Sequence, residues 1–337
     1  MFTIKMRAIA AIALAATAAL TIAGAAQAGP LQPNAADPGD VQLLTTDGNS
    51  SLVHTVRHSD STWQKFGRIE GYTGVVGLTS TLLSGEENVF FQYSGPNGPQ
   101  LAHFVRHADQ TWNWNATTPA LPAGATVDDL TVATVGGQIV LIQQKDGVLK
   151  ESTQGTDGAW SAWSNVPSNG KVRSVAATGA NGTLRVVELS ADGKSVTDFD
   201  QYSSGAWNNG VSTSVNTDPN YTATELAATA DYNGVQIGLV ETYFNFNVGV
   251  YHSILHDSTG SFDRFQSVST VLNNYYQVSD LAMTFSQGEM QLTFSTPDGL
   301  LFHTIRDYQG NWQHAGDVES VAGNVTAGQV TIAGYSY

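Results

Sequence analysis

The chain contains no cysteine among its 337 residues. Without cysteine the fold cannot be cross-linked by disulfides, carry a lipid on a cysteine or use thiol chemistry. A chain of this length buries enough apolar surface to fold without such cross-links. The sequence therefore predicts a fold stabilised by its core and its backbone hydrogen bonds.

Basic residues are also scarce, since 14 Lys and Arg stand against 29 Asp and Glu, which gives a net charge of −15. Proteins that bind DNA, RNA or anionic lipid need clustered Lys and Arg. We therefore expect no nucleic acid as a partner and no anionic membrane surface.

The first 28 residues have the features of a signal peptide. Lys5 and Arg7 precede a run rich in Ala, Leu and Ile, and Ala26-Gln27-Ala28 has the small-x-small form that signal peptidases cleave. The alternative, a membrane anchor, lacks a following stop-transfer pattern, so no membrane insertion is expected. Together with the absent cysteine, this Ala-rich leader is typical of a bacterial protein that is secreted into the extracellular space.

A stretch of twelve residues recurs along the chain. Its first copy, Leu52 to Trp63, reads LVHTVRHSDSTW, and clear copies end at Trp112 and Trp312. The aromatic ends of successive copies lie 47 to 55 residues apart, close to the roughly 40–50 residues of a β-propeller blade. These ends are Trp63, Trp112, Trp160, Trp207, Phe262 and Trp312.

Each repeat divides into four short strands, and no long run has helical period. The first repeat lacks its inner strand, whereas an unassigned strand, Val325 to Tyr335, remains at the end of the chain. Pairing it with Val41–Thr46 covers two exposed edges and closes a ring. The sequence therefore predicts an all-β, six-bladed β-propeller of four-stranded antiparallel blades over residues 41–337. Residues 29–40, with three prolines, are expected to form a disordered leader, and a seven-bladed ring is the alternative architecture.

Tight hairpins are expected between the two outer strands of each blade, because turn-forming dipeptides lie there. These dipeptides are Asp60-Ser61, Asp109-Gln110, Asp157-Gly158, Ser204-Gly205, Thr259-Gly260 and Gln309-Gly310.

Histidines recur four residues apart in the repeats, as in His54 and His58. On a helix this spacing would suggest a metal pair, but on a strand the two rings lie about 13 Å apart, too far to share one ion. No metal site is therefore expected. The inner histidines either bind ligand or form a hydrogen bond across the blade; they are His54, His103, His252 and His303.

Three arginines, Arg57, Arg106 and Arg306, follow the inner His in blades that become neighbours once the ring closes. A uniform structural role would require the Arg in every blade, so its clustering favours ligand binding. An Arg beside a Trp supplies donors for sugar hydroxyls and a flat surface for the sugar ring. The alternative is an Arg that pairs with a hairpin Asp or stacks on the adjacent Trp. The proposed ligand-binding set is Arg57, Arg106, Arg306, Trp63, Trp112, Trp312, His54, His103 and His303.

These repeats resemble those of secreted bacterial β-propellers and of tectonin-like and fucose-binding six-bladed propeller lectins. The resemblance covers nearly the whole mature chain and implies that ligands bind in clefts between blades. In fucose-binding rings a Glu accompanies the Arg, and no repeated counterpart of that Glu can be placed from the sequence pattern.

Three carboxylates occupy matching positions at the start of the inner strands, namely Asp129, Glu225 and Asp280. There they would face the mouth of the central channel, where a propeller hydrolase or a calcium ion would need them. The alternative is that they are solvated rim residues.

Aromatic residues are also expected in loops at this mouth: Tyr72, Tyr221, residues 243–246 and Tyr275-Tyr276. Exposed, they would form a binding surface for glycan or protein; folded inward, they would cover the core.

The leading hypothesis is a non-catalytic, lectin-like propeller that binds glycan or polysaccharide at several inter-blade sites without a cofactor, where multivalency would strengthen weak contacts. The alternatives are a glycoside hydrolase or lyase that uses the axial carboxylates, and an extracellular protein-interaction scaffold.

Overall fold

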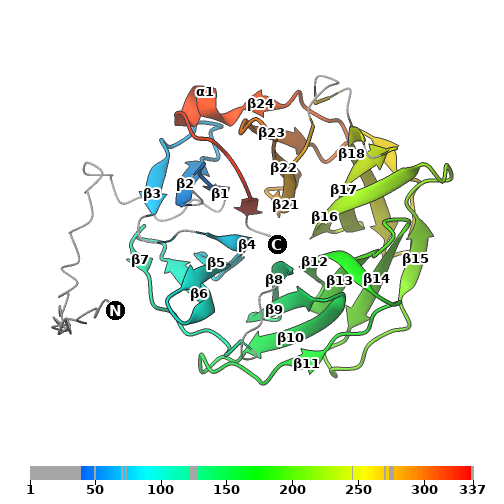
Figure 1. The fold of residues 1–337 in the computed structure, drawn as a ribbon, viewed down its shortest axis with the longest axis horizontal. Helices are drawn as coiled ribbons and strands as arrows, with labels where there is room; N and C mark the ends of the chain where they lie inside the picture. The colour runs from blue at the N-terminus through cyan, green and yellow to red at the C-terminus, as the bar shows by residue number, and fades with distance from the viewer. Residues whose placement is uncertain are drawn as a thin grey trace, which may run out of the picture. The chain divides into compact units, whose positions relative to one another are not determined.

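The computed structural model of the chain describes residues 39–48, 51–69, 72, 74–121, 128–244, 246–268, 271–272 and 277–334. Six antiparallel sheets lie around a common centre (Figure 1), and each sheet is one blade. The predicted all-β, six-bladed propeller is therefore confirmed. The predicted signal peptide and all but two residues of the predicted leader lie outside the described residues.

In the first three blades the strands follow one another from the centre of the ring outward, and Figure 1 labels each of them except β25. Blade 1 contains β25 (Val330–Ala333), β1 (Val41–Thr46), β2 (Leu52–Arg57) and β3 (Gly67–Ile69). Blade 2 contains β4 (Val76–Leu83), β5 (Glu86–Gly95), β6 (Gly98–Arg106) and β7 (Trp112–Asn113). Blade 3 contains β8 (Asp129–Val135), β9 (Gln138–Lys145), β10 (Val148–Gln154) and β11 (Ser164–Asn165).

The other three blades repeat this order. Blade 4 contains β12 (Val172–Ala180), β13 (Thr183–Ser190), β14 (Ser195–Gln201) and β15 (Val211–Ser214). Blade 5 contains β16 (Tyr221–Asp231), β17 (Gly234–Tyr243), β18 (Phe246–His256), β19 (Ser261–Phe262) and β20 (Gln266–Ser267). Blade 6 contains β21 (Asp280–Ser286), β22 (Glu289–Ser295), β23 (Leu301–Arg306) and β24 (Gly316–Asp317).

Ring closure follows the predicted route. The C-terminal strand β25 pairs antiparallel with β1 and becomes the inner strand of blade 1, in the register Leu43↔Ile332. The pairing is shorter than the predicted strand, since β25 ends at Ala333. The chain between blade 6 and β25 forms a short helix that the sequence reading did not predict, α1 (Val318–Ala322), whose first backbone amides are capped by the Asp317 carboxylate.

The outermost strand of most blades is interrupted, in contrast to the continuous strand that the pattern predicts. In blade 1, Trp63 forms an isolated bridge with Arg57, and regular pairing resumes only at β3. The break is bridged by a side chain, because the Thr55 hydroxyl donates to the Gln64 carbonyl oxygen at 2.6 Å. The same bond recurs from Ser152, Ser253 and Thr304 to the carbonyl oxygens of Ser161, Asp263 and Gln313.

The hairpins before these outer strands lie where the turn dipeptides predict them. In each dipeptide the second residue has a positive φ, from 61° at Gly260 to 89° at Gly310, and this includes the non-glycine residues Ser61 and Gln110. In blade 1 the Ser61 amide donates to the His58 carbonyl oxygen and the His58 amide donates to that of Thr62. This geometry is the three-residue hairpin that ends in a left-handed residue.

The hydrophobic core is divided among the interfaces between consecutive blades, which we call seams and number by the two blades. One cluster, for example, joins Leu189 and Val196 of blade 4 to Val235 and Ile237 of blade 5. Within the described part of the chain, no helix has the length and hydrophobicity needed to span a membrane.

Closure by β25 should be the most sensitive point of the fold. Ile332, which is 3% exposed, should lose about 2–5 kcal/mol of unfolding free energy when replaced by Ala, because a buried cavity forms in the closing strand. Val76→Ala is the control, since Val76 lies on the inner strand of blade 2 but is 43% exposed; it should change this free energy by no more than about 0.5 kcal/mol. Urea unfolding followed by circular dichroism measures both, and equal midpoints for the two variants would contradict this account.

Candidate functional site

Each seam that contains an inner histidine is built on the same contact between two blades. The His of one blade meets the Trp of the next blade edge to face, with ring centroids 5.4 Å apart for His54 and Trp112 and 5.3 Å apart for His303 and Trp63. His252 and Trp312 repeat this contact at 5.4 Å. The structure therefore places Trp63, Trp112 and Trp312 half-buried in the seams, where they pack on histidines and core side chains.

The inner histidines form hydrogen bonds across their own blades. Nε2 of His303 lies 2.8 Å from Oε1 of Gln291 on β22, and Nε2 of His54 lies 2.9 Å from Oε1 of Gln42 on β1. His103 and His252 make the same contact with Asn88 and Gln236. Burial lowers the pKa of His303 and of His252 to about 3 and that of His103 to about 4, so these rings are neutral and hold an amide in place.

The three arginines differ in their exposure although their positions in the repeat are equivalent. Arg106 is 6% exposed, and the charges of Glu87 and Asp40 act on its guanidinium. Arg306 is half-buried, and its Nε has no hydrogen-bond partner among the residues that the structure describes. Arg57 is also half-buried and lines a cavity that opens at seam 6/1.

The cavity at seam 6/1 has a volume of about 230 Å³ and draws its walls from both blades. It is lined by Gly39, Arg57, Ser59, Ser61, Ser286, Gln287, Glu289, Gln291, Ile305 and Gln313. Gly39 fits against the Gln287 amide, which a Cβ at this position would overlap. His303 lies behind this wall and orients Gln291 through its hydrogen bond.

Arg57 keeps most of its hydrogen-bonding capacity free in this cavity. Its Nη2 donates to the Ser61 hydroxyl at 3.0 Å, which is its only side-chain hydrogen bond to another described residue. Burial lowers the pKa of Arg57, and the charges of Glu289 and Asp60 act in the opposite direction. A guanidinium and a carboxylate from opposite blades therefore lie around one polar cavity. Glu289 and Gln291 escaped the sequence analysis, although an alignment of the second strand of each blade would have shown Gln or Asn before every inner His.

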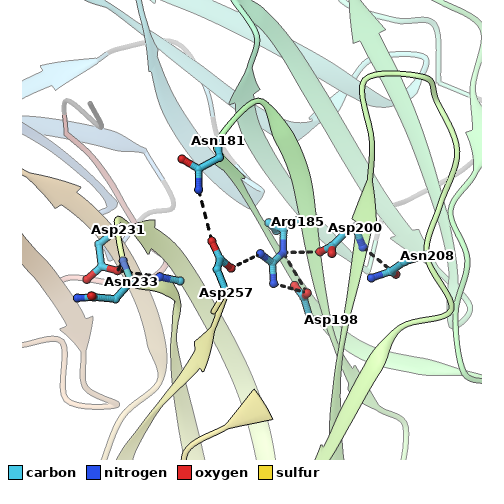
Figure 2. A network of polar contacts seen from close by, with 9 residues as sticks. Asn181, Arg185, Asp198, Asp200, Asn208, Asp231, Asn233 and Asp257 are labelled. Carbon is cyan, nitrogen blue, oxygen red and sulfur yellow. Dashed lines mark hydrogen bonds and ion pairs between the residues drawn. The ribbon is translucent and has the colours of Figure 1, made fainter. Parts of the chain in front are cut away.

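At seam 4/5 a pair of charged side chains takes the place of the Gln and His pair found in blade 6. Arg185 on β13 stands where Gln291 stands in blade 6, and Asp198 on β14 stands where His303 stands. The Arg185 guanidinium contacts Asp198 Oδ2 at 2.7 Å through Nη2, Asp200 Oδ1 at 2.5 Å through Nε, and Asp257 Oδ1 of blade 5 at 2.7 Å through Nη1. Figure 2 shows these carboxylates around the guanidinium.

The Arg185 side chain is 9% exposed. Burial acts to lower the pKa of Arg185, and Asp198, Asp257 and Asp200 raise it above its ordinary value. The Arg185 guanidinium is thus paired with carboxylates of the protein itself, whereas the Arg57 guanidinium at seam 6/1 faces a cavity.

The three axial carboxylates come together as the alignment predicted. Asp129, Glu225 and Asp280 line one small cavity of about 100 Å³ at the centre of the ring. Their oxygens accept bonds from the protein: Asp129 Oδ2 from the Val175 amide at 3.0 Å, and Asp280 Oδ2 from the Val330 amide at 2.6 Å. These bonds link inner strands of neighbouring blades, and Asp280 links blade 6 to the closing strand.

The axial carboxyl groups lie around one serine hydroxyl. The Ser174 hydroxyl lies 3.1 Å from both Asp129 Oδ2 and Glu225 Oε1, and a hydroxyl has one proton to donate. A proton on one of the two carboxyl groups lets both contacts be hydrogen bonds, and this agrees with the direction of the pKa shifts. Burial raises the pKa of Asp129 to about 6, that of Asp280 to about 7 and that of Glu225 well above its usual value. Among the described residues, no group of three His, Asp or Glu side chains is arranged to hold a metal ion.

The aromatic loops have two different arrangements. Tyr72 is folded inward and contacts Phe91 and Phe104 at ring distances of 5.3 and 5.1 Å. Phe244 and Phe246, at the turn between β17 and β18, are 59% and 74% exposed. Tyr221 lies beside Tyr243, with ring centroids 4.9 Å apart, and Tyr275-Tyr276 lies outside the described residues.

No protein-family model matches the chain, and no curated protein sequence matches it. Solved structures of lectins do resemble it. A fungal lectin from Aleuria aurantia, a six-bladed β-propeller with a novel mode of fucose recognition, is 17% identical over 84% of this chain and 92% of that chain, with a TM-score of 0.59. The BP39L lectin from Burkholderia pseudomallei is 16% identical over 82% of this chain and 80% of that chain, with a TM-score of 0.55. A variant of AofleA from Arthrobotrys oligospora is 14% identical over 91% and 89%, with a TM-score of 0.61. At these identities the similarity establishes the shared fold.

The charged seam predicts a rescue experiment. Arg185→Gln should lower the free energy of unfolding by about 3–5 kcal/mol, because Asp198 stays buried without its cation. Adding Asp198→His should restore much of this loss, since Gln and His form a hydrogen bond at the same positions in three other blades. Chemical denaturation of the single and double variants measures the coupling. A double variant no more stable than Arg185→Gln would show that the two positions are not interchangeable between blades.

The axial cluster predicts a pH-dependent difference between wild type and Asp280→Asn. Because burial raises the Asp280 pKa from 3.8 to about 7, the folded chain keeps a proton there that the unfolded chain releases. The wild type therefore loses the Asp280 contribution to stability as the pH rises from about 4 to about 7, whereas Asn does not titrate. Urea titrations at a series of pH values should show the variant gaining stability relative to wild type across this window and no further above it. A difference that is constant with pH would contradict the raised pKa.

Proposed function

We propose that this chain is a carbohydrate-binding propeller and that the cavity at seam 6/1 is its principal binding site. The observation that carries the proposal is Arg57, a half-buried guanidinium with free donors opposite Glu289 in a polar cavity between two blades. A guanidinium fork donates to neighbouring sugar hydroxyls, and a carboxylate accepts from them. The structural likeness to the fucose-specific lectin of Aleuria aurantia and to the BP39L lectin supports this function.

Several equivalent inter-blade sites were expected from the repeats, but the seams differ in how well their side chains support sugar binding. Seam 1/2 contains Arg106, but this side chain is buried beside Glu87. Seam 5/6 contains the half-buried Arg306, whose unpartnered Nε makes it a second candidate. Trp63, Trp112 and Trp312 support these seams by packing on histidines, so we propose polar rather than stacking recognition.

We further propose that the protein acts outside the cell. The support is the leader that ends in Ala26-Gln27-Ala28 after an Ala-rich run. An excess of acidic residues agrees with a neutral glycan as the partner and disfavours nucleic acids and anionic membranes. The bacterial style of this leader is part of the same proposal.

Two other functions have less support. A hydrolase at the axis would need carboxylates open to substrate, but Asp129 and Asp280 bond to backbone amides around a cavity of about 100 Å³. A protein-binding role has one specific observation in its favour, which is the exposure of Phe244 and Phe246 at the tip of the β17–β18 hairpin.

Replacement of Arg57 tests the binding site. Arg57→Gln should lower glycan-array signals at least about tenfold, because a charged donor pair to the sugar is lost. Arg264→Gln removes the same charge from an exposed position on blade 5 and should leave the signals unchanged. An array without any bound glycan would refute the carbohydrate function, and equal signals for the two variants would refute this site.

A further inference from the structure

The walls of the cavity at seam 6/1 are almost entirely polar. Of its ten lining residues, eight have polar or charged side chains, one is glycine, and Ile305 is the single apolar side chain. No aromatic ring lines it. Trp63, the nearest candidate in the repeat, is turned edge-on toward His303 instead.

This composition decides which kind of sugar fits. A 6-deoxy hexose carries a methyl group in place of the C6 hydroxymethyl group, and where this methyl contacts the protein it needs an apolar wall, because it leaves neighbouring donors and acceptors unpaired. Sites built to hydrogen-bond a hydroxyl reject the analogue that lacks it, while apolar pockets discriminate weakly. At seam 6/1 the amides of Gln287, Gln291 and Gln313 line the cavity, so a methyl group has little apolar surface to meet.

The charges in the cavity further restrict which sugars can bind. Arg57 and Glu289 contribute one positive and one negative charge from opposite blades, so these two side chains together leave the site close to neutral. An anionic sugar would pair with Arg57 only by approaching Glu289, in a chain whose net charge is −15. A neutral diol pairs with both, since hydroxyls donate to a carboxylate and accept from a guanidinium.

The size limits the ligand to about one ring. The volume of about 230 Å³ is below the roughly 300–1,000 Å³ of sites for drug-sized ligands. The cavity therefore has room for one pyranose, and further residues of a glycan would extend into solvent.

From these observations we infer that seam 6/1 binds a single neutral, fully hydroxylated hexose, in preference to its 6-deoxy and uronic acid counterparts. The inference rests on the proposed carbohydrate function and specifies the class of sugar for the same site. Such a preference would distinguish this chain from the Aleuria aurantia lectin, which is fucose-specific.

Matched sugars that differ only at C6 provide the test. In the galacto, gluco and manno series, the parent hexose, the 6-deoxy hexose and the uronate carry a hydroxymethyl, a methyl and a carboxylate group at the same carbon. Isothermal titration calorimetry of the full chain with the nine methyl glycosides, and with L-galactose against L-fucose, measures the preference directly. In every series that binds, the parent hexose should bind at least about tenfold more tightly than the other two.

Glu289→Gln tests the charge argument with a close control. The substitution should weaken the binding of the parent hexose at least about fivefold. It should also reduce the discrimination against the uronate, because the carboxylate opposite Arg57 is gone. Glu86→Gln is the matched control, since Glu86 stands at the same repeat position in blade 2, where it pairs with His107 and faces a seam with Gln154 in place of Arg. The control should leave all affinities unchanged.

The outcomes separate the two proposals. Tighter binding of 6-deoxy sugars that is lost in Arg57→Gln would overturn the inference and leave the carbohydrate function standing. Unchanged discrimination in Glu289→Gln would also overturn it. The absence of binding by every sugar would overturn the proposed function as well.

Discussion

The pairing of β25 with β1 is the interaction on which the rest of the structure depends. Its ladder, with Leu43 opposite Ile332, supplies the inner strand that blade 1 lacks. The same strand donates the Val330 amide to Asp280 and so ties blade 1 to blade 6 at the centre. Arg57 and Glu289 face one cavity only because this pairing makes the first and last blades neighbours.

The six seams use one scaffold to hold different chemistry. In blades 1, 5 and 6, a Gln and a neutral His form a hydrogen bond across the blade, and in blade 4 Arg185 and Asp198 replace this pair. Buried polar positions must be satisfied together, because one unpaired partner costs more than the pair contributes. Exchange of both partners therefore lets one seam become a closed ion-pair network and another an open polar cavity.

The architecture was within reach of the sequence because it is repeated. The spacing of Trp63, Trp112 and Trp312 and the unassigned C-terminal strand were sufficient to predict six blades and their closure. The interrupted outer strands were not predictable from the sequence. At each break a side-chain hydroxyl, such as that of Thr55, donates to a backbone carbonyl oxygen of the outer strand. The site was only half predicted: Arg57 was identified in the repeat, but Glu289 comes from a strand far along the chain. The edge-to-face contact of Trp63 with His303 was also not predictable, since it joins two blades that are far apart in the sequence.

Ring closure by β25 also fixes the order in which the parts of the cavity are synthesised and assembled. During synthesis Arg57 emerges early, and Glu289 and β25 emerge at the end. The cavity at seam 6/1 is thus completed only when the final blade docks on the first, a contact of large sequence separation that forms late. A nascent or truncated chain that lacks β25 would display Arg57 without its facing carboxylate, so the cavity at seam 6/1 forms only once the closing strand has paired with blade 1.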